Sequence, residues 1–399
     1  MRGVFGGVAC GLLIFGVAAP ARATSLAAKV KEVETRAAGG TAIDATVPTV
    51  EGLLPRGIDF PATSTAPGFT YSYNPDLGVF ERSKSLGPAL LERAETLGKG
   101  HFDLGLSFLF ADFTTLDGQD LKGFPFKAVV IPASSNAAVV LPATFHKLAV
   151  RTSELTLSSS YGITDHWDVN ILVPALWTSL STAVQFSAGA IQSSQNEKIG
   201  LGDVQVRTKY RLTEGSGFNV AAGLGLRLPT GKKTDFQGFG DTTVTPFLVG
   251  SQIFHGHDFH INLGMETNAN DIDLSRVRYG AGVALQPWEP LAFLIDVIGS
   301  SGIQSTTLTT KSPAGVDPTD LGPDAQCPTC PTGVQVNRRA DGQFDIVTPV
   351  GRTDVVDIAV GLKARIAGNV VAFASAIVPL TSDGVRADVV PTGGIEIGF

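Results

Sequence analysis

Residues 167–177 read Trp-Asp-Val-Asn-Ile-Leu-Val-Pro-Ala-Leu-Trp, and this stretch decides the fold class of the chain. Aromatic and aliphatic side chains occupy every second position from Trp167 to Trp177, while the positions between them begin with Asp168 and Asn170. Alternation with a period of two predicts a β-strand that has one apolar and one more polar face. The strand is therefore expected to separate two different environments.

The two tryptophans at its ends have the spacing of a membrane. At roughly 3.3 Å per residue, Trp167 and Trp177 lie about 33 Å apart along an extended strand. A tilt of roughly 40° turns this length into about 25 Å of height, which is the thickness of the apolar band on an outer-membrane barrel. Because indole rings favour the headgroup region, the stretch is predicted to cross a bilayer.

About twelve stretches of the chain repeat this alternation, so the prediction extends from one strand to a whole barrel. Only helices and closed barrels satisfy their backbone groups in lipid. We therefore expect an all-β fold, a transmembrane antiparallel up-and-down β-barrel of about 12 strands. The expected strands are residues 101–113, 148–164, 167–180, 200–213, 217–229, 241–254, 258–268, 275–287, 290–300, 354–366, 369–380 and 387–399.

The connections between these strands alternate in length. Short turns are expected at 164–166, 214–216, 255–257, 287–289 and 367–369. Long connections are expected at 114–147, 181–199, 230–240, 269–274, 301–353 and 381–386. Tight periplasmic turns and longer external loops are typical of barrels in the bacterial cell outer membrane, which is the location that the sequence predicts.

Aromatic residues and the last residue support the same location. The chain stops at Phe399 after alternating Ile395 and Ile397, which is similar to the signature by which outer-membrane barrels are recognised for assembly. Membrane lipids and the barrel-assembly machinery are therefore the expected macromolecular partners. The predicted aromatic girdle consists of Tyr161, Trp167, Trp177, Tyr210, Trp288 and Phe399.

The first residues carry the features of an export signal. Arg2 is followed by a mostly apolar stretch and by Ala21-Arg22-Ala23, which is a typical cleavage site, so residues 1–23 are predicted to be a signal peptide. Apolar residues make up 43% of the chain, but beyond the signal none form a run of about 18. The net charge of −7 argues against a nucleic-acid partner.

Residues 24–100 lack the alternation of the barrel, which is assigned to residues 101–399. Residues 25–37 are expected to form a short amphipathic helix with Leu26, Val30 and Val33 on one side. The stretch that begins at Leu86 suggests one or two further helical turns. The extension is therefore predicted to be partly irregular and partly helical.

Two interpretations of residues 24–100 stay open. The segment is either a loose N-terminal periplasmic extension or a plug inside the lumen of the barrel. A plug would shelter large apolar side chains that an extension would leave in water. These side chains are Phe69, Tyr71, Tyr73, Leu90 and Leu91.

Charged residues of the expected strands share the parity that faces the lumen. A charge on the lipid face costs about 2–4 kcal/mol at the midplane of the membrane, so this confinement is informative. The side chains form either an interior ladder of salt bridges or a charged wall around a substrate path. The predicted lumen-lining residues are Gln205, Arg207, Lys209, Arg211, Arg227, Glu266, Arg276, Arg278, Asp296, Asp357, Lys363, Arg365 and Glu396.

Enzymatic and metal-binding motifs are not found. Leu228-Pro-Thr-Gly-Lys-Lys-Thr lacks the spacing of a phosphate-binding loop. The histidines near His257 are interpreted as a polar turn, with His260 facing inward, so neither a metal nor a cofactor is expected. Cys327 and Cys330 are expected to form a local disulfide in the longest loop.

Two motifs carry a resemblance to a known family. Gly162-Ile-Thr-Asp-His-Trp-Asp-Val-Asn-Ile-Leu-Val-Pro174 and Gly200-Leu-Gly-Asp-Val-Gln-Val-Arg-Thr-Lys-Tyr-Arg211 look like its paired strand motifs, and Leu228-Pro-Thr-Gly231 with the ending Gly393–Phe399 fits the same picture. The family is that of outer-membrane β-barrel transporters of aromatic degradation (the phenol meta-pathway), distantly similar to the long-chain fatty-acid channels. The resemblance covers about 145–399 and implies architecture far better than substrate.

These observations predict an outer-membrane channel or transporter for small hydrophobic or aromatic molecules. A structural or surface-exposed barrel with a blocked lumen is the first alternative. A barrel-embedded lipid hydrolase is the third interpretation, because His146 or His260 could pair with a serine. No residue stands out as a nucleophile, so the protein is not expected to be an enzyme.

Overall fold

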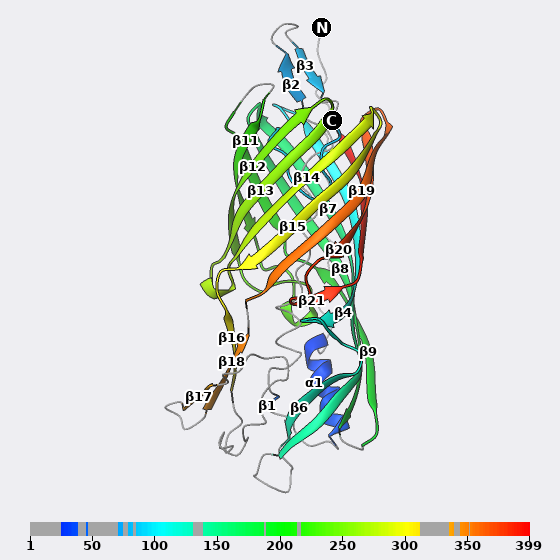
Figure 1. Cartoon of the computed structure of the whole chain (residues 1–399), viewed down its shortest axis with the longest axis vertical. Coiled ribbons are helices and arrows are strands. Elements are labelled where there is room, and N and C mark those ends of the chain that lie inside the picture. The colour runs from blue at the N-terminus through cyan, green and yellow to red at the C-terminus, as the bar shows by residue number, and fades with distance from the viewer. Residues whose placement is uncertain are drawn as a thin grey trace, which may run out of the picture.

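The computed structural model describes residues 25–38, 45–46, 71–74, 79–82, 85–130, 139–186, 189–213, 217–311, 335–338, 344–350 and 352–399. The predicted signal peptide and the two cysteines, Cys327 and Cys330, lie outside these ranges. Most of the described residues belong to one antiparallel sheet that closes on itself (Figure 1).

The sheet is a closed barrel with twelve strand positions in the described part of the chain. Closure joins the C-terminal strand to the first barrel strand, with Ile395 opposite Leu106. Strands β9 and β10 share one position beside β8, and β21 and β22 share one beside β4. The barrel strands are β4 (Phe102–Leu116), β7 (Val139–Thr164), β8 (Trp167–Phe186), β9 (Gln192–Leu201), β10 (Gln205–Arg211), β11 (Asn219–Arg227), β12 (Thr243–Phe254), β13 (His257–Asn268), β14 (Arg276–Trp288), β15 (Leu291–Gly302), β19 (Asp354–Ala367), β20 (Val370–Pro379), β21 (Val385–Ala387) and β22 (Val390–Gly398).

The alternation that predicted these strands is visible in their exposure. On β8, Ile171 and Trp177 are 44% and 52% exposed, whereas Asp168 and Asn170 are buried. The same pattern recurs on β13, where Ile261 faces outward. The exterior is therefore apolar and the interior polar, as a barrel in lipid requires. The predicted fold class is confirmed.

One end of the barrel carries the short turns and the other carries the long connections. The C-terminal residue lies at the short-turn end, where Phe399 and Phe102 exchange backbone hydrogen bonds of 2.7 and 3.1 Å. In an outer-membrane barrel short turns face the periplasm and long connections face outward. We call these the short-turn end and the long-loop end.

The long connections contain more strand than the sequence indicated. The expected loops at 114–147 and 181–199 hold the ends of β7, β8 and β9 together with β5 (Gln119–Asp120) and β6 (Phe124–Val130). Strands β7 and β8 stay paired from Ala143↔Phe186 down to their turn, so the wall extends past the membrane band. The predicted boundaries were wrong here because strand pairing continues where the membrane pattern stops. The expected loop at 301–353 contains a separate sheet of β16 (Thr306–Lys311), β18 (Phe344–Val350) and β17 (Gln335–Arg338).

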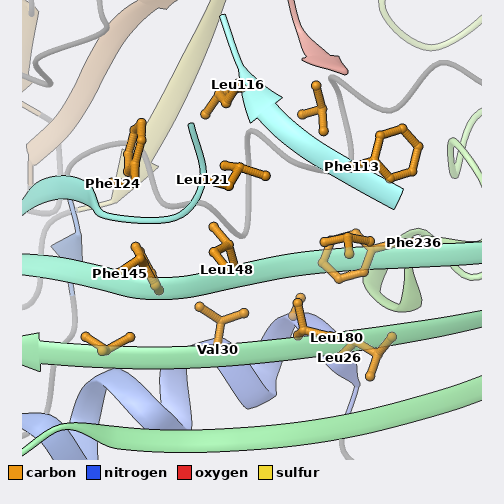
Figure 2. Close-up of a cluster of buried hydrophobic side chains, with 14 of the residues drawn as sticks. Leu26, Val30, Phe113, Leu116, Leu121, Phe124, Phe145, Leu148, Leu180 and Phe236 are labelled. Atoms are coloured by element: carbon orange, nitrogen blue, oxygen red, sulfur yellow. The ribbon is translucent and has the colours of Figure 1, made fainter. Parts of the chain in front are cut away.

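A helix packs on the inside of the long-loop end. Helix α1 (Leu26–Ala37) begins after Ser25, whose Oγ accepts a hydrogen bond of 3.3 Å from the backbone N–H of Ala28. Figure 2 shows Leu26 and Val30 of this helix among buried side chains of the barrel extension. The predicted helix and its apolar side are confirmed. Burying that side against β8 and β9 fixes the helix at the end opposite Phe399 (Figure 1).

The connection between β11 and β12 folds inward beside this helix. It contains the 3₁₀ helix η1 (Lys233–Asp235), and Asp235 Oδ1 accepts a hydrogen bond of 2.8 Å from the backbone N–H of Leu26. A second 3₁₀ helix, η2 (Ile272–Leu274), lies in the connection between β13 and β14. This inward fold places the Phe239 ring beside the guanidinium groups of Arg227 and Arg276.

Three short strands precede the barrel among the described N-terminal residues. Strand β1 (Ala45–Thr46) pairs with β6, and β2 (Tyr71–Asn74) with β3 (Val79–Arg82) forms a hairpin at the short-turn end (Figure 1). Residues 85–97, named here the inner segment, then lie inside the barrel. The helical turns expected from Leu86 onward are absent from the inner segment. Its backbone groups bond to the barrel wall instead, and this competes with a helix.

Candidate functional site

The inner segment packs against small side chains of the barrel wall. Leu86 is fully buried beside Ala284 and Ala292, and Ala94 is fully buried beside Ala221. Leu90, 7% exposed, lies against Ala359 on β19, the strand next to β15. Alanines at inward positions leave the space that the segment occupies. In the short-turn half, the interior therefore has the packing of a protein core.

Side chains of the wall also satisfy the backbone of the inner segment. The N–H of Ala94 donates to Ser251 Oγ at 3.0 Å, and the N–H of Leu97 donates to Asp168 Oδ2 at 2.9 Å. Asn262 bonds twice to Glu92, accepting from its N–H and donating to its carbonyl, each at 2.8 Å. Because buried backbone groups require partners, these wall residues fix the path of the segment.

Two predicted lumen-lining lysines hold the segment directly. Lys209 Nζ donates to the carbonyl oxygens of Arg93 and Glu95 at 2.8 and 3.0 Å. Lys363 Nζ donates to the carbonyl of Pro88 at 3.0 Å and lies 3.1 Å from Glu396 Oε2, and Lys363 is wholly buried. Both ammonium groups are thus directed at the inner segment.

Charged residues of the inner segment pair with the wall in turn. Glu92 lies 3.0 Å from Arg207 and 3.6 Å from Lys209. Arg93 Nη1 lies 3.9 Å from Asp258. His260 lies beside Asp258, and its Nε2 lies 2.9 Å from Asp296. Ion pairs that are out of water require close geometry to offset their desolvation. The segment is therefore joined to the barrel by charge as well as by packing.

A cavity of about 150 Å³ remains between the inner segment and the long-loop end. Its size matches that of a cavity that holds one benzene ring, ~150 Å³. Leu90, Leu91 and Phe247 form apolar parts of its lining. Its polar lining comes from Glu92, Gln205, Arg207, Arg227, Thr243, Thr245, Asn262, Glu266, Arg278, Ser300 and Asp357.

Three arginines surround one carboxylate at the long-loop side of this cavity. Arg278 Nε donates to Glu266 Oε2 at 2.6 Å, Arg276 Nε lies 3.7 Å from Oε1, and Arg227 Nη2 lies 3.8 Å from Oε2. Phe239 covers the group, with its ring centroid 4.6 Å from the guanidinium carbon of Arg227 and 5.7 Å from that of Arg276. The cluster combines positive charge with an aromatic face.

Other predicted lumen residues lie apart from this cluster. Arg211 Nη2 donates to the carbonyl of Asp165 at 3.4 Å near the short turn, and Arg365 lies 3.1 Å from Glu289. Asp357 lines the cavity and is paired with Arg386. The structure thus divides the thirteen predicted side chains between the inner segment, the cavity and the turns.

Several side chains at or beside the cavity were not identified from the sequence. Phe247 lies at an inward position of β12, and Gly223 opposite has no Cβ that would meet its ring. An aromatic residue at inward parity is the signal that could have identified Phe247. Phe239 lies in a long connection and Glu92 in the inner segment, and neither stretch has a period that indicates orientation.

The aromatic residues of the predicted girdle point outward. The indole N–H of Trp167 donates to Thr208 Oγ1 at 2.6 Å, and the His166 and Tyr210 rings stack 6.2 Å apart. These residues belong to the short-turn end, while Trp177 lies ten residues further along β8. All six predicted girdle residues are exposed, from 42% at Trp167 to 61% at Trp288 and Phe399.

Among the described residues, neither a metal site nor the site of a hydrolase is assembled. No group of three or more His, Cys, Asp or Glu side chains there could hold a metal ion. His146 Nε2 lies 2.6 Å from Gln185 Oε1, and His260 Nε2 contacts Asp296 rather than a serine hydroxyl. That the protein is not an enzyme stays a prediction. No helix in the described ranges is long and apolar enough to span a membrane.

A family model described as "Putative MetA-pathway of phenol degradation" matches residues 135–318. The match contains the two strand motifs on which the resemblance was based and ends before Phe399, so the resemblance is confirmed over that range. No curated protein matches the sequence.

Solved structures with a similar fold include three outer-membrane proteins. An outer membrane channel from Pseudomonas putida F1 is 13% identical, with 77% of this chain and 98% of that chain covered and a TM-score of 0.42. A FadL homologue from Pseudomonas aeruginosa is 10% identical, with coverage of 86% and 98% and a TM-score of 0.32. OprB from Pseudomonas putida is 9% identical, with coverage of 75% and 93% and a TM-score of 0.31.

The closed barrel, its apolar exterior and its outward aromatic residues identify a protein of the bacterial outer membrane.

Proposed function

We propose that this protein is an outer-membrane channel for small hydrophobic or aromatic molecules, with residues 24–100 as its plug. The observation that carries the proposal is the cavity of about 150 Å³ between the inner segment and the long-loop end. Its volume suits one aromatic ring, and its lining combines apolar side chains with a few polar groups, as ligand sites do. The family description, which refers to phenol degradation, agrees with this substrate class.

In this proposal the solute occupies the cavity and the inner segment is the remaining barrier. Leu90 and Leu91 belong to the segment and also line the cavity, so the barrier and the binding position share residues. A solute that packs on these leucines competes with contacts that hold the segment in place. Passage then requires the segment to shift toward the periplasm, since it fills the short-turn half of the lumen.

The second candidate, a structural barrel with a blocked lumen, is favoured by a different observation. Arg93 and Lys363 are wholly buried where the inner segment meets the wall. Such complete burial suits a permanent seal. The two candidates differ in whether a solute enters the cavity and crosses the barrel.

The test fills the cavity without altering the barrel exterior. Thr245 lines the cavity, whereas Leu248 on the same strand is 52% exposed on the apolar outside. We expect Thr245→Trp to abolish binding of benzyl alcohol to the purified protein and its uptake by porin-deficient bacterial cells. Leu248→Trp adds the same ring to the lipid face and should leave both unchanged. Equal binding and uptake in wild type and Thr245→Trp would contradict the channel proposal.

A further inference from the structure

We infer that the long-loop side of the cavity is a subsite for the carboxylate of a one-ring aromatic solute, with Arg227 and Arg278 as its ligands. The inference rests on the proposed function, because the cavity that holds the ring is the same. It goes further by assigning the charge of the solute and the residues that bind it.

Charge is the first argument. Three guanidinium groups, those of Arg227, Arg276 and Arg278, gather around the Glu266 carboxylate. Glu154 on β7 is a second carboxylate that interacts electrostatically with Arg227. These donors already hold one carboxylate, so their chemistry suits a second one, and a wall of low dielectric strengthens the attraction.

Two other carboxylates that line the cavity have cations beside them. Glu92 lies 3.0 Å from Arg207 and 3.6 Å from Lys209, and Asp357 is paired with Arg386. These cations limit the repulsion that either acid exerts on an anionic solute.

A donor without a partner is the second argument. Nη1 of Arg227 is buried and has no hydrogen-bond partner among the described residues, and the side chain is only 10% exposed. Buried polar groups almost always have a partner. A carboxylate oxygen of a bound solute would supply one, because guanidinium groups bind carboxylates through paired N–H donors.

The third argument is that the Arg227 plane is fixed before a solute arrives. The Phe239 ring stacks on its face at 4.6 Å, so the in-plane N–H groups stay available. Phe239 is positioned by Asp203, whose carboxylate accepts the N–H of Phe239 at 2.8 Å and that of Gly231 at 2.9 Å. A ligand group that is held in advance loses less entropy on binding.

The shape of the cavity gives the rest of the ligand. Leu90 and Leu91 line it from the inner segment, and Arg227 and Arg278 line it from strand ends at the long-loop side. A molecule that suits both linings has one apolar ring and one anionic group. Benzoate is the simplest probe of that chemistry, and benzamide is its neutral match in size.

The experiment measures the affinity of purified full-length mature protein for both probes in detergent. Arg227→Gln should weaken benzoate binding about 10-fold and leave benzamide binding within about twofold. Glu266→Gln, which releases the arginines from their carboxylate, should strengthen benzoate binding by about threefold. Migration of unheated samples on gels checks that each variant is folded.

The opposite signs of the two variants separate a binding role from a structural one. If Arg227→Gln does not fold, Glu266→Gln decides alone: tighter benzoate binding supports the subsite and unchanged binding overturns it. Benzoate and benzamide binding equally to wild type and to Arg227→Gln would overturn the subsite while leaving the proposed function intact. If neither probe binds to wild type, the proposed function falls and the subsite falls with it.

Discussion

The two halves of the barrel interior use the same kind of residue in different ways. In the short-turn half, Lys209 and Lys363 donate to backbone carbonyls of the inner segment. In the long-loop half, Arg227 and Arg278 border a cavity, and Nη1 of Arg227 has no hydrogen-bond partner among the described residues. All four face inward on barrel strands, so parity alone does not separate them. What lies opposite each side chain decides whether it binds the inner segment or borders the cavity.

The largest loss of stability is expected for a substitution in the short-turn half. Lys363→Met removes a wholly buried ammonium and leaves Glu396 buried without it. Removing one partner of a buried pair costs about 3–5 kcal/mol. The free energy of unfolding, measured with denaturant, should therefore fall by about that amount.

Arg352→Met is the control for this prediction. Arg352 is paired with Asp354, but its side chain is 54% exposed, so the loss should stay below about 1 kcal/mol. Equal losses in the two variants would show that the short-turn half is not packed as described.

A smaller effect is expected from the exterior. Ile171→Arg places a charge at the lipid face of β8 and should cost about 2–4 kcal/mol near the midplane, which impairs assembly. Val206→Arg on the neighbouring strand should act alike. Gln205→Arg, at an inward position that lines the cavity, should assemble normally. Heat-modifiable migration on gels reports assembly, and identical behaviour of the three variants would refute the assigned parity.

The smallest effect is expected in the long-loop half. Arg278→Gln leaves Glu266 with Arg227 and Arg276, and its side chain is 23% exposed. We therefore expect a loss of stability below about 1 kcal/mol, as for other partly exposed pairs. Unfolding both variants in denaturant compares the stability that each half loses. If Arg278→Gln loses as much free energy of unfolding as Lys363→Met, the two halves do not differ as described.

The sequence predicted the barrel wall well because the wall obeys one rule. Every strand must present apolar residues to lipid and polar ones inward, so Ile171 and Asp168 reveal their faces by position alone. Helix α1 was predictable for a similar reason, since Leu26, Val30 and Val33 mark one side of a helix.

The site was predicted only in part, because the inner segment has no period. Residues 85–97 bond to wall residues that are remote in sequence, such as Ser251 and Asn262, and nothing local in the chain indicates that pairing. Because the position of the segment was not known from the sequence, Lys363 was predicted only to line the lumen. Phe239 was missed for the same reason, because Asp203 at the break between β9 and β10 fixes its place.

The central claim is that residues 85–97 close the short-turn half of the barrel, and single-channel conductance in planar bilayers tests it most directly. A chain that lacks residues 24–95 loses the contacts of Glu92, Arg93 and Ala94 with the wall. We predict that it still folds to a heat-modifiable barrel and conducts ions at several times the level of the full chain. A folded deletion variant whose conductance equals that of the full chain would contradict the account.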